Sequence, residues 1–162
     1  MSADQPHAIR FLDALPASAR QQLESISSTR EYPPGAVLFQ EGSEHDDIYL
    51  IVTGTVRLEM LVRDRGRLPL MTLGPGDLLG WSPLFGGHPM TATAIALQAV
   101  RVICFDGQEL RGLCETNHEV GYHVMRQLAL VLSDRLLATR LQLLDLFHKD
   151  LPIQPAPRDP EC

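Results

Sequence analysis

The sequence contains little cysteine. Its 162 residues include three cysteines, Cys104, Cys114 and Cys162, an odd number with no C-x-x-C pair. Small disulfide-stabilised domains carry an even set of regularly spaced cysteines. A disulfide framework is therefore excluded. Cys104 lies in an apolar run, where we expect it to be a small core residue.

Long apolar runs and an excess of positive charge are also missing. No run is long enough to cross a membrane and no secretory signal is visible, so we expect a cytoplasmic protein. The formal net charge is −6, whereas nucleic-acid-binding domains usually present a basic face. The one tight basic cluster, Arg63, Arg65 and Arg67, flanks Gly66, and we expect it to be a solvated hairpin tip.

Sequence signatures of catalysis are absent as well. The sequence contains no P-loop, and Ser82 belongs to no recognisable nucleophile–base pattern. We therefore predict a protein that is not an enzyme, with no metal site and no fixed cofactor.

What is present is the composition of one globular domain, with 44% hydrophobic and 21% charged residues. We expect residues 1–8 to be flexible and residues 9–148 to fold together. Apolar residues before residue 30 recur at helical intervals, and Pro16 divides them into two short helices. Over residues 30–106, short apolar stretches alternate with turn signals roughly every 8–12 residues. This rhythm predicts an antiparallel barrel or jelly roll, in a mainly β fold with flanking helices.

The segment 73–94 has the most unusual composition, because it carries five glycines and three prolines between two predicted strands. Ser82 and Pro83 predict the N-cap and first turn of a short helix, whose free N–H groups favour an anion. Gly80 leaves room for a ligand to approach the backbone. The segment is either a ligand cradle or a glycine-rich connection, and its spacing alone leaves both interpretations open.

A long helix is predicted over residues 116–148, opened by a capping box of Thr116 and Glu119. Its apolar residues do not fit one stripe, so it must be covered on more than one side. We expect one face to cover the barrel and the other to pair with a second copy; the alternative is a helix wholly buried in its own domain. The proline-rich residues 149–162 are predicted to be a disordered tail. The predicted homodimer interface comprises Met125, Leu128, Leu132, Leu136, Thr139 and Leu143.

Three motifs occur in a characteristic order: Y-L-I-V-T-G-T-V at 49–56, G-P-G-D-L-L-G at 74–80 and D-R-L-L-A-T-R at 134–140. With these motifs the chain resembles the cyclic-nucleotide-binding domain. More narrowly, it is similar to the sensor half of the catabolite-activator and fumarate–nitrate-regulator family of bacterial transcription factors. The resemblance covers about residues 10–147 and implies a role in signal transduction through ligand binding.

The resemblance also implies a pocket in which two anchors are replaced. Members that bind cAMP carry a glutamate for the ribose at the position of Trp81. They carry an arginine for the cyclic phosphate at the position of Met90, once the turn is shortened by one residue. Indole accepts no hydrogen bond and a thioether carries no charge. Because each lost contact is worth ~1.5–3 kcal/mol, we do not expect tight cAMP binding by the usual contacts, and we expect an apolar or aromatic group there instead.

The predicted pocket draws on the barrel and, by the resemblance, on the long helix, where Thr139 and Arg140 occupy the place of an adenine-contacting pair. His88 is included as a possible positive charge below its pKa. The predicted ligand is nucleotide-like, or another small anionic or aromatic molecule. The predicted pocket residues are Leu70, Gly80, Trp81, Ser82, Leu84, His88, Met90, Thr91, Ala92, Arg135, Thr139 and Arg140.

Three functional hypotheses follow. The first is a non-enzymatic, homodimeric regulatory module that senses a small ligand or acts through protein partners. Family transcription factors continue into a helix-turn-helix domain, whereas this sequence ends at Cys162, so we expect no direct DNA binding. The second is a cupin-like metal enzyme, suggested by His45 and its acidic neighbours. The third is an interaction-only subunit with no ligand.

Overall fold

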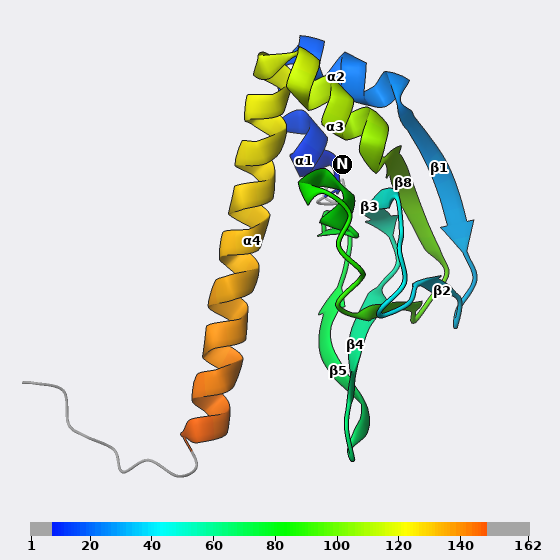
Figure 1. The fold of residues 1–162 in the computed structure, drawn as a ribbon, viewed down its shortest axis with the longest axis vertical. Helices are drawn as coiled ribbons and strands as arrows, with labels where there is room; N and C mark the ends of the chain where they lie inside the picture. Colours follow the sequence, from blue (N-terminus) through cyan, green and yellow to red (C-terminus); the bar gives the residue numbers. More distant parts are fainter. Residues whose placement is uncertain (1–7, 149–162) are drawn as a thin grey trace, which may run out of the picture. The chain divides into compact units, whose positions relative to one another are not determined.

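The computed structural model describes residues 8–148, with side chains from Phe11 onward. Two four-stranded sheets follow short N-terminal helices and precede a long C-terminal helix (Figure 1), so the predicted fold class is confirmed. None of the helices between residues 8 and 148 has the length and apolarity needed to cross a membrane. In chain order the elements are α1 (Ala8–Asp13), α2 (Ala17–Ser25), β1 (Ser27–Tyr32), β2 (Val37–Phe39), β3 (Asp47–Thr53), β4 (Val56–Val62), β5 (Gly66–Leu73), β6 (Leu78–Leu79), the 3-10 helix η1 (Ser82–Phe85), β7 (Thr93–Ala96), β8 (Val100–Asp106), α3 (Gly107–Thr116) and α4 (His118–Phe147).

The sheets have the strand orders β1-β8-β3-β6 and β2-β7-β4-β5, and paired strands are antiparallel. Their inner faces enclose one apolar cluster, which includes Tyr49, Ile51 and Met90. β3 buries four consecutive residues, Ile48–Ile51, because its second face is also covered. There, side chains from α1, α2, α3 and the start of α4 meet the sheet; this second apolar layer comprises Phe11, Leu23, Ile48, Leu78, Leu84, Phe105, Leu110, Val124 and Leu128.

The described chain divides into two compact units, and the division falls within α4 between Leu128 and Ala129. Leu128 is 2% exposed in the first unit, whereas no described residue from Ala129 to His148 is buried. The alternative of a helix wholly buried in its own domain is therefore wrong. The interface prediction for Leu128 is also wrong, because its side chain already belongs to its own core.

Two local predictions need correction. The start of α4 is capped by Asn117, whose Oδ1 accepts from the Val120 N–H at 3.2 Å; the Thr116 hydroxyl instead donates to the Gly112 carbonyl of α3 at 2.9 Å. The structure also adds β1, which the apolar pattern does not predict. The sequence of β1, Ser-Ser-Thr-Arg-Glu-Tyr, is polar because β1 is an edge strand with mostly exposed side chains.

Candidate functional site

The candidate site is the β6–β7 segment, residues 80–92. It begins at Gly80, which has φ +74°, and a Cβ added there would lie 2.9 Å from the Asp47 carbonyl oxygen. The rings of Phe39 and Tyr49 lie directly beneath, 3.6 and 3.8 Å from that Cβ position. Only glycine fits both the backbone conformation and the space, so the segment is held close against the barrel at this point.

The middle of the segment forms η1, a single 3-10 turn. The predicted short helix is present, but Trp81 is its N-cap and makes no side-chain cap hydrogen bond, while Ser82 is the first helical residue. The predicted Ser82 cap is therefore wrong. We assign no anion site to this N-terminus, because one four-residue turn carries little of a helix dipole.

The end of the segment is tied to the β2–β3 connection. The Met90 N–H donates to the Ser43 carbonyl at 2.9 Å, and the Gly42 N–H donates to the Met90 carbonyl at 2.7 Å. The Met90 side chain is 4% exposed and belongs to the apolar cluster that contains Phe39 and Tyr49. At the position where the family resemblance implies a cation, the structure has a core thioether.

An aromatic stack supports this part of the barrel. The His45 ring lies between Phe39 and Tyr49, at centroid distances of 5.5 and 5.3 Å, and the Tyr32 hydroxyl donates to the Tyr49 hydroxyl at 3.2 Å. His45 Nε2 is buried with no hydrogen-bond partner in the described part of the chain. Burial lowers the pKa of His45, because the charged imidazolium loses its hydration, and it raises the pKa of Tyr49. The ring set beneath the segment is therefore neutral.

The other predicted pocket residues differ in exposure and in the part of the chain that carries them. Trp81 and Ser82 are half-buried and Ala92 is buried, whereas the side chains of His88, Thr91 and Leu70 are exposed. Leu84 is corrected, because it points into the second apolar layer and not into the barrel. Arg135, Thr139 and Arg140 lie on α4 in the second unit, where the Thr139 hydroxyl donates to the Arg135 carbonyl at 2.9 Å. Their part in a pocket stays a prediction.

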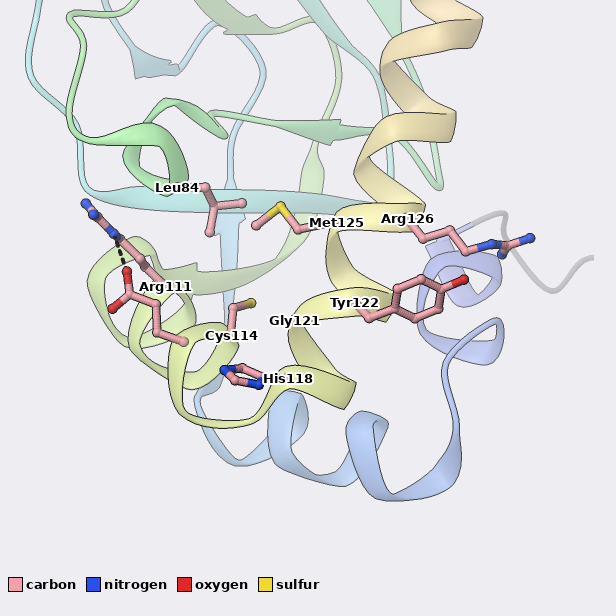
Figure 2. A pocket seen from close by; sticks show the side chains of 9 residues that line it. Leu84, Arg111, Cys114, His118, Gly121, Tyr122, Met125 and Arg126 are labelled. Atoms are coloured by element: carbon pink, nitrogen blue, oxygen red, sulfur yellow. Dashed lines mark hydrogen bonds and ion pairs between the residues drawn. The ribbon is translucent and has the colours of Figure 1, made fainter.

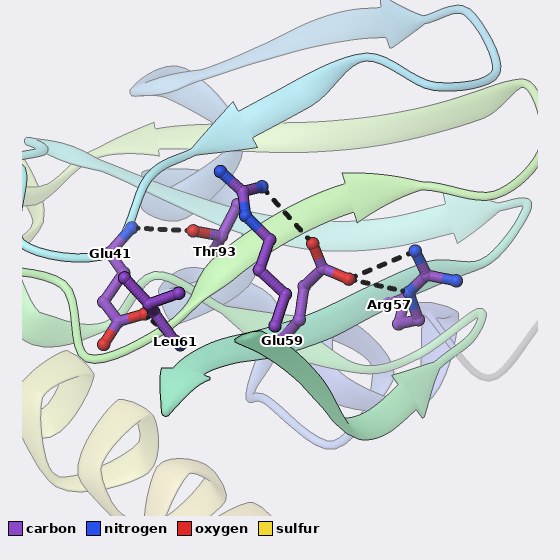
Figure 3. Close-up of polar contacts among 6 residues, drawn as sticks. Glu41, Arg57, Glu59, Leu61 and Thr93 are labelled. Atoms are coloured by element: carbon purple, nitrogen blue, oxygen red, sulfur yellow. Dashed lines mark hydrogen bonds and ion pairs between the residues drawn. The ribbon is translucent and has the colours of Figure 1, made fainter. Parts of the chain in front are cut away.

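A polar network that the sequence analysis missed lies on the outer face of the second sheet (Figure 3). The Glu59 side chain is 8% exposed and forms ion pairs with Arg57 at 3.1 Å and with Arg67 at 3.5 Å. Beside it, the Glu41 carboxylate accepts from the Leu61 N–H at 2.7 Å, and the Thr93 hydroxyl oxygen accepts from the Glu41 N–H at 3.0 Å. The available signal was Arg57 and Glu59 two residues apart, on one face of a strand.

These charges compensate one another, so we interpret the network as structural. Arg67 is therefore more than part of a solvated hairpin tip. Between residues 8 and 148, no three His, Cys, Asp or Glu side chains are grouped so that they could hold a metal ion. The His45 ring packs against the rings of Phe39 and Tyr49, and this arrangement offers the cupin hypothesis no support.

Comparison with known proteins identifies the family. The family model of the cyclic nucleotide-binding domain matches residues 29–117, which is more than half of the chain. The chain belongs to the cyclic nucleotide-binding domain family. The match covers the strands, the β6–β7 segment and α3, so the predicted resemblance is confirmed.

One individual relative is a bacterial regulator. The CRP-like cAMP-activated global transcriptional regulator of Mycobacterium tuberculosis is 31% identical over 137 residues, covering 84% of this chain and 57% of the regulator. The chain therefore spans a little over half the length of this relative.

Solved structures agree with this assignment. A protein of Geobacter metallireducens described as cyclic nucleotide-binding is 29% identical, with a TM-score of 0.69 over 78% of this chain and 92% of that chain. The N-terminal domain of a transcriptional regulator from Streptomyces coelicolor is 27% identical, with a TM-score of 0.66 over 83% and 94%.

Proposed function

We propose that the chain is a non-catalytic sensor module of the cyclic nucleotide-binding family that takes a ligand other than cAMP. The observation that carries this proposal is the chemistry of the β6–β7 segment. Its residues 80–92 include no Asp, Glu, Lys or Arg, and Met90 is buried in an apolar cluster. A cyclic phosphate beside Met90 would meet no lysine or arginine from this segment, and burying an uncompensated charge is costly. A ligand with an apolar or aromatic group suits Trp81, with the Ser82 and Thr91 hydroxyls available to orient it.

Leu84 supplies a route from this segment to α4. Its side chain is 6% exposed and lines the same apolar layer as Val124 and Leu128, the last residue of the first unit. A ligand that moves η1 must therefore also repack the base of α4. A shift between two arrangements of α4 is then the signal passed to a partner.

We further propose that the partner of α4 is a second copy of this chain. Beyond Leu128 the helix exposes large apolar side chains, among them Leu136 at 52% and Leu143 at 49%. Contiguous exposed apolar surface of this kind marks an interaction site. Leu132, Leu136, Thr139 and Leu143 keep the spacing of a helix seam, so the predicted interface is retained without Leu128.

A thermal-shift panel with cAMP, cGMP, cyclic dinucleotides and linear nucleotides tests the ligand proposal. A ligand at 100 times its Kd stabilises by ~2.7 kcal/mol, which raises Tm by roughly 5–10 °C in a chain of this size. We expect no shift of the wild-type protein with cAMP. A clear shift would contradict the proposal.

A designed double variant tests whether the residues at positions 81 and 90 account for the absence of a response to cAMP. We expect Trp81→Glu/Met90→Arg to be less stable than wild type without ligand, because it buries a charge, and to recover Tm with cAMP. Trp81→Glu alone is the matched control, since it restores the ribose acceptor without the cation. Equal responses of the double and single variants would argue against the assigned role of Met90.

The interaction-only subunit is the second candidate, and the burial of Met90 in a continuous core favours it. In that case no small molecule shifts Tm, while α4 still pairs. A Tm shift with any member of the panel would therefore contradict the second candidate, whereas a dimer is expected in both cases.

A further inference from the structure

The β2–β3 connection and the first residue of β3 hold both ends of the β6–β7 segment. At the far end, the Gly42 N–H and the Ser43 carbonyl are bonded to the backbone of Met90, at 2.7 and 2.9 Å. At the near end, Gly80 lies against the Asp47 carbonyl oxygen, which a Cβ added to this glycine would approach to 2.9 Å. The segment is therefore attached to one short stretch of chain at two separate points.

His45 lies between these two attachments in the sequence. Its ring packs against Phe39 and Tyr49, and the same two rings lie beneath Gly80. Its Nε2 is buried with no hydrogen-bond partner in the part of the chain that the structure describes. An imidazolium has a donor at both ring nitrogens, and a buried donor without an acceptor is costly. The closed arrangement therefore suits the neutral ring and not the charged one.

Charged neighbours of His45 do not supply the missing acceptor. Asp46 and Asp47 favour the imidazolium, whereas Arg30 disfavours it. The Asp47 carboxylate already accepts from Arg30 at 2.7 Å. Desolvation of the ring outweighs the two carboxylates, so the pKa of His45 is lowered.

The remaining titratable groups around this ring do not compensate its charge either. Burial raises the pKa of Tyr49 and of Cys104, its register partner on β8, so both side chains are neutral at pH 7 and below. The Tyr32 hydroxyl donates to the Tyr49 hydroxyl, and Asp106 is the N-cap of α3. The β6–β7 segment contributes one titratable side chain, His88, which is exposed.

We infer that protonation of His45 releases the β6–β7 segment from the barrel, so that the candidate site opens as the pH falls. The charged ring gains hydration only by leaving the space between its aromatic neighbours. This movement withdraws residues 42–47 from Met90 and from Gly80, because His45 lies within that stretch. The proton therefore favours an open form of the segment over the closed one.

The release is local, because η1 is anchored elsewhere. The Leu84 side chain of η1 is buried in the second apolar layer and lines a groove with Met125 of α4 (Figure 2). Neither His45 nor the backbone bonds to Met90 belong to this anchorage. The segment therefore detaches at its two ends while η1 and the core strands keep their packing.

The direction of the effect follows from where the proton binds more tightly. The closed form has the lowered His45 pKa, whereas the open form has the ordinary value of about 6.5. The opening equilibrium therefore rises by at most about tenfold for each pH unit below that value, and stops rising below the lowered pKa. A ligand that needs the closed segment would bind more weakly by the same factor; this consequence alone rests on the proposed function.

Hydrogen exchange of single amides, measured by NMR on the full chain without ligand, tests the release. The reporters are the Gly42 and Met90 N–H groups, which form the far attachment, and the Val102 amide of the buried strand β8 is the reference. After correction for intrinsic exchange, we expect the protection of both reporters to fall about tenfold from about pH 7.5 to about pH 5.0. Both should exchange faster than Val102 at every pH.

Three variants assign the effect to one side chain. His45→Phe keeps a ring in the stack and takes up no proton, so we expect the protection of both reporters to become independent of pH. His45→Gln is a second uncharged variant, so the result does not depend on the folding of one protein. His88→Gln, at an exposed position of the same segment, should keep the wild-type response.

Three results would each overturn the inference. Equal protection of Gly42 and Met90 at the two pH values would show that protonation does not release the segment. A wild-type response in the two His45 variants would assign the effect to another group. Exchange of both reporters at the rate of Val102 would show that the unit opens only as a whole. These results leave the ligand proposal untouched, because the experiment uses no ligand.

Discussion

The two parts of α4 have similar apolar composition but very different surroundings. Before Ala129, the residues Val120, Val124 and Leu128 are no more than 2% exposed. After it, Leu137, Leu144 and Leu146 are 56%, 61% and 71% exposed. The proximal part is stabilised by its own unit, whereas the distal part finds no cover within the described chain. One continuous helix therefore combines a structural role at its base with surface for a partner beyond it.

Truncating one leucine in each part should give the largest contrast. Leu128→Ala removes a side chain that is 2% exposed, and we expect it to lower the free energy of unfolding by about 2–5 kcal/mol. Leu141→Ala, at a position 53% exposed, should change it by about 0.5 kcal/mol or less. Urea denaturation measures both. Similar losses would show that the two parts of α4 do not differ in this way.

Charges at Leu136 and Leu143, two residues of the proposed α4 interface, should dissociate the dimer without unfolding the first unit. Because burying one leucine contributes about 1.5–3 kcal/mol, we expect Leu136→Asp/Leu143→Asp to give monomers by sedimentation with unchanged near-UV circular dichroism. Leu137→Asp/Leu144→Asp is the matched control, at somewhat more exposed positions of α4 outside the proposed interface. A stronger effect of the control pair would move the interface to the other side of the helix.

Glycine at the base of α4 offers a smaller test of the same contrast. Gly121→Ala adds a Cβ that would lie 2.6 Å from the Cys114 carbonyl oxygen, so we expect a loss of about 1–3 kcal/mol although alanine favours helices. Ser133→Ala, exposed in the distal part, should be neutral or slightly stabilising. Thermal denaturation measures both variants. Equal Tm values for the two would contradict the close packing of α3 against α4.

Acidification should destabilise the first unit through His45 and have the smallest effect. The pKa of His45 is lowered chiefly by desolvation; Asp46 and Asp47 oppose that shift and Arg30 adds to it. The unfolded state therefore binds the proton first, so stability falls as pH drops below about 6.5 and stops falling below the lowered folded pKa. We expect His45→Phe, which keeps the ring stack, to flatten this dependence in urea titrations.

The control for the pH experiment is His88→Gln, because His88 is exposed. Its profile should follow that of the wild-type protein. If the stability of His45→Phe depended on pH as steeply as that of the wild-type protein, other groups would be responsible for the acid sensitivity.

Much of the fold was predictable because its signals are local. Turn residues at regular intervals predicted the barrel, and a long run without proline predicted α4. β1 escaped detection because an edge strand needs no apolar alternation. The face that Leu128 presents to its own core was not predictable either, since the helical pattern contains more than one apolar stripe and does not say which one the domain covers.

The candidate site was predictable only in part. Gly80, Trp81 and Met90 were identified from the family motif. In the structure Met90 belongs to the apolar cluster that contains Phe39 and Tyr49, and the rings of these two residues lie beneath Gly80. The direction of Leu84 depends on how η1 is seated against the helices, which no local pattern encodes. The Glu59 network likewise depends on Arg57, Glu59 and Arg67, which come from two strands and meet only once their register is set.

Hydrogen exchange along α4 at two protein concentrations tests the difference between its parts most directly. Below and above the dimer Kd, we expect amides 120–128 to keep the same protection, because their own unit supplies it. Amides 130–146 should become more protected at the higher concentration, since a second copy then covers them. Strong protection of the distal amides at every concentration, with no dependence on association, would contradict the assignment of this part of the helix to a partner.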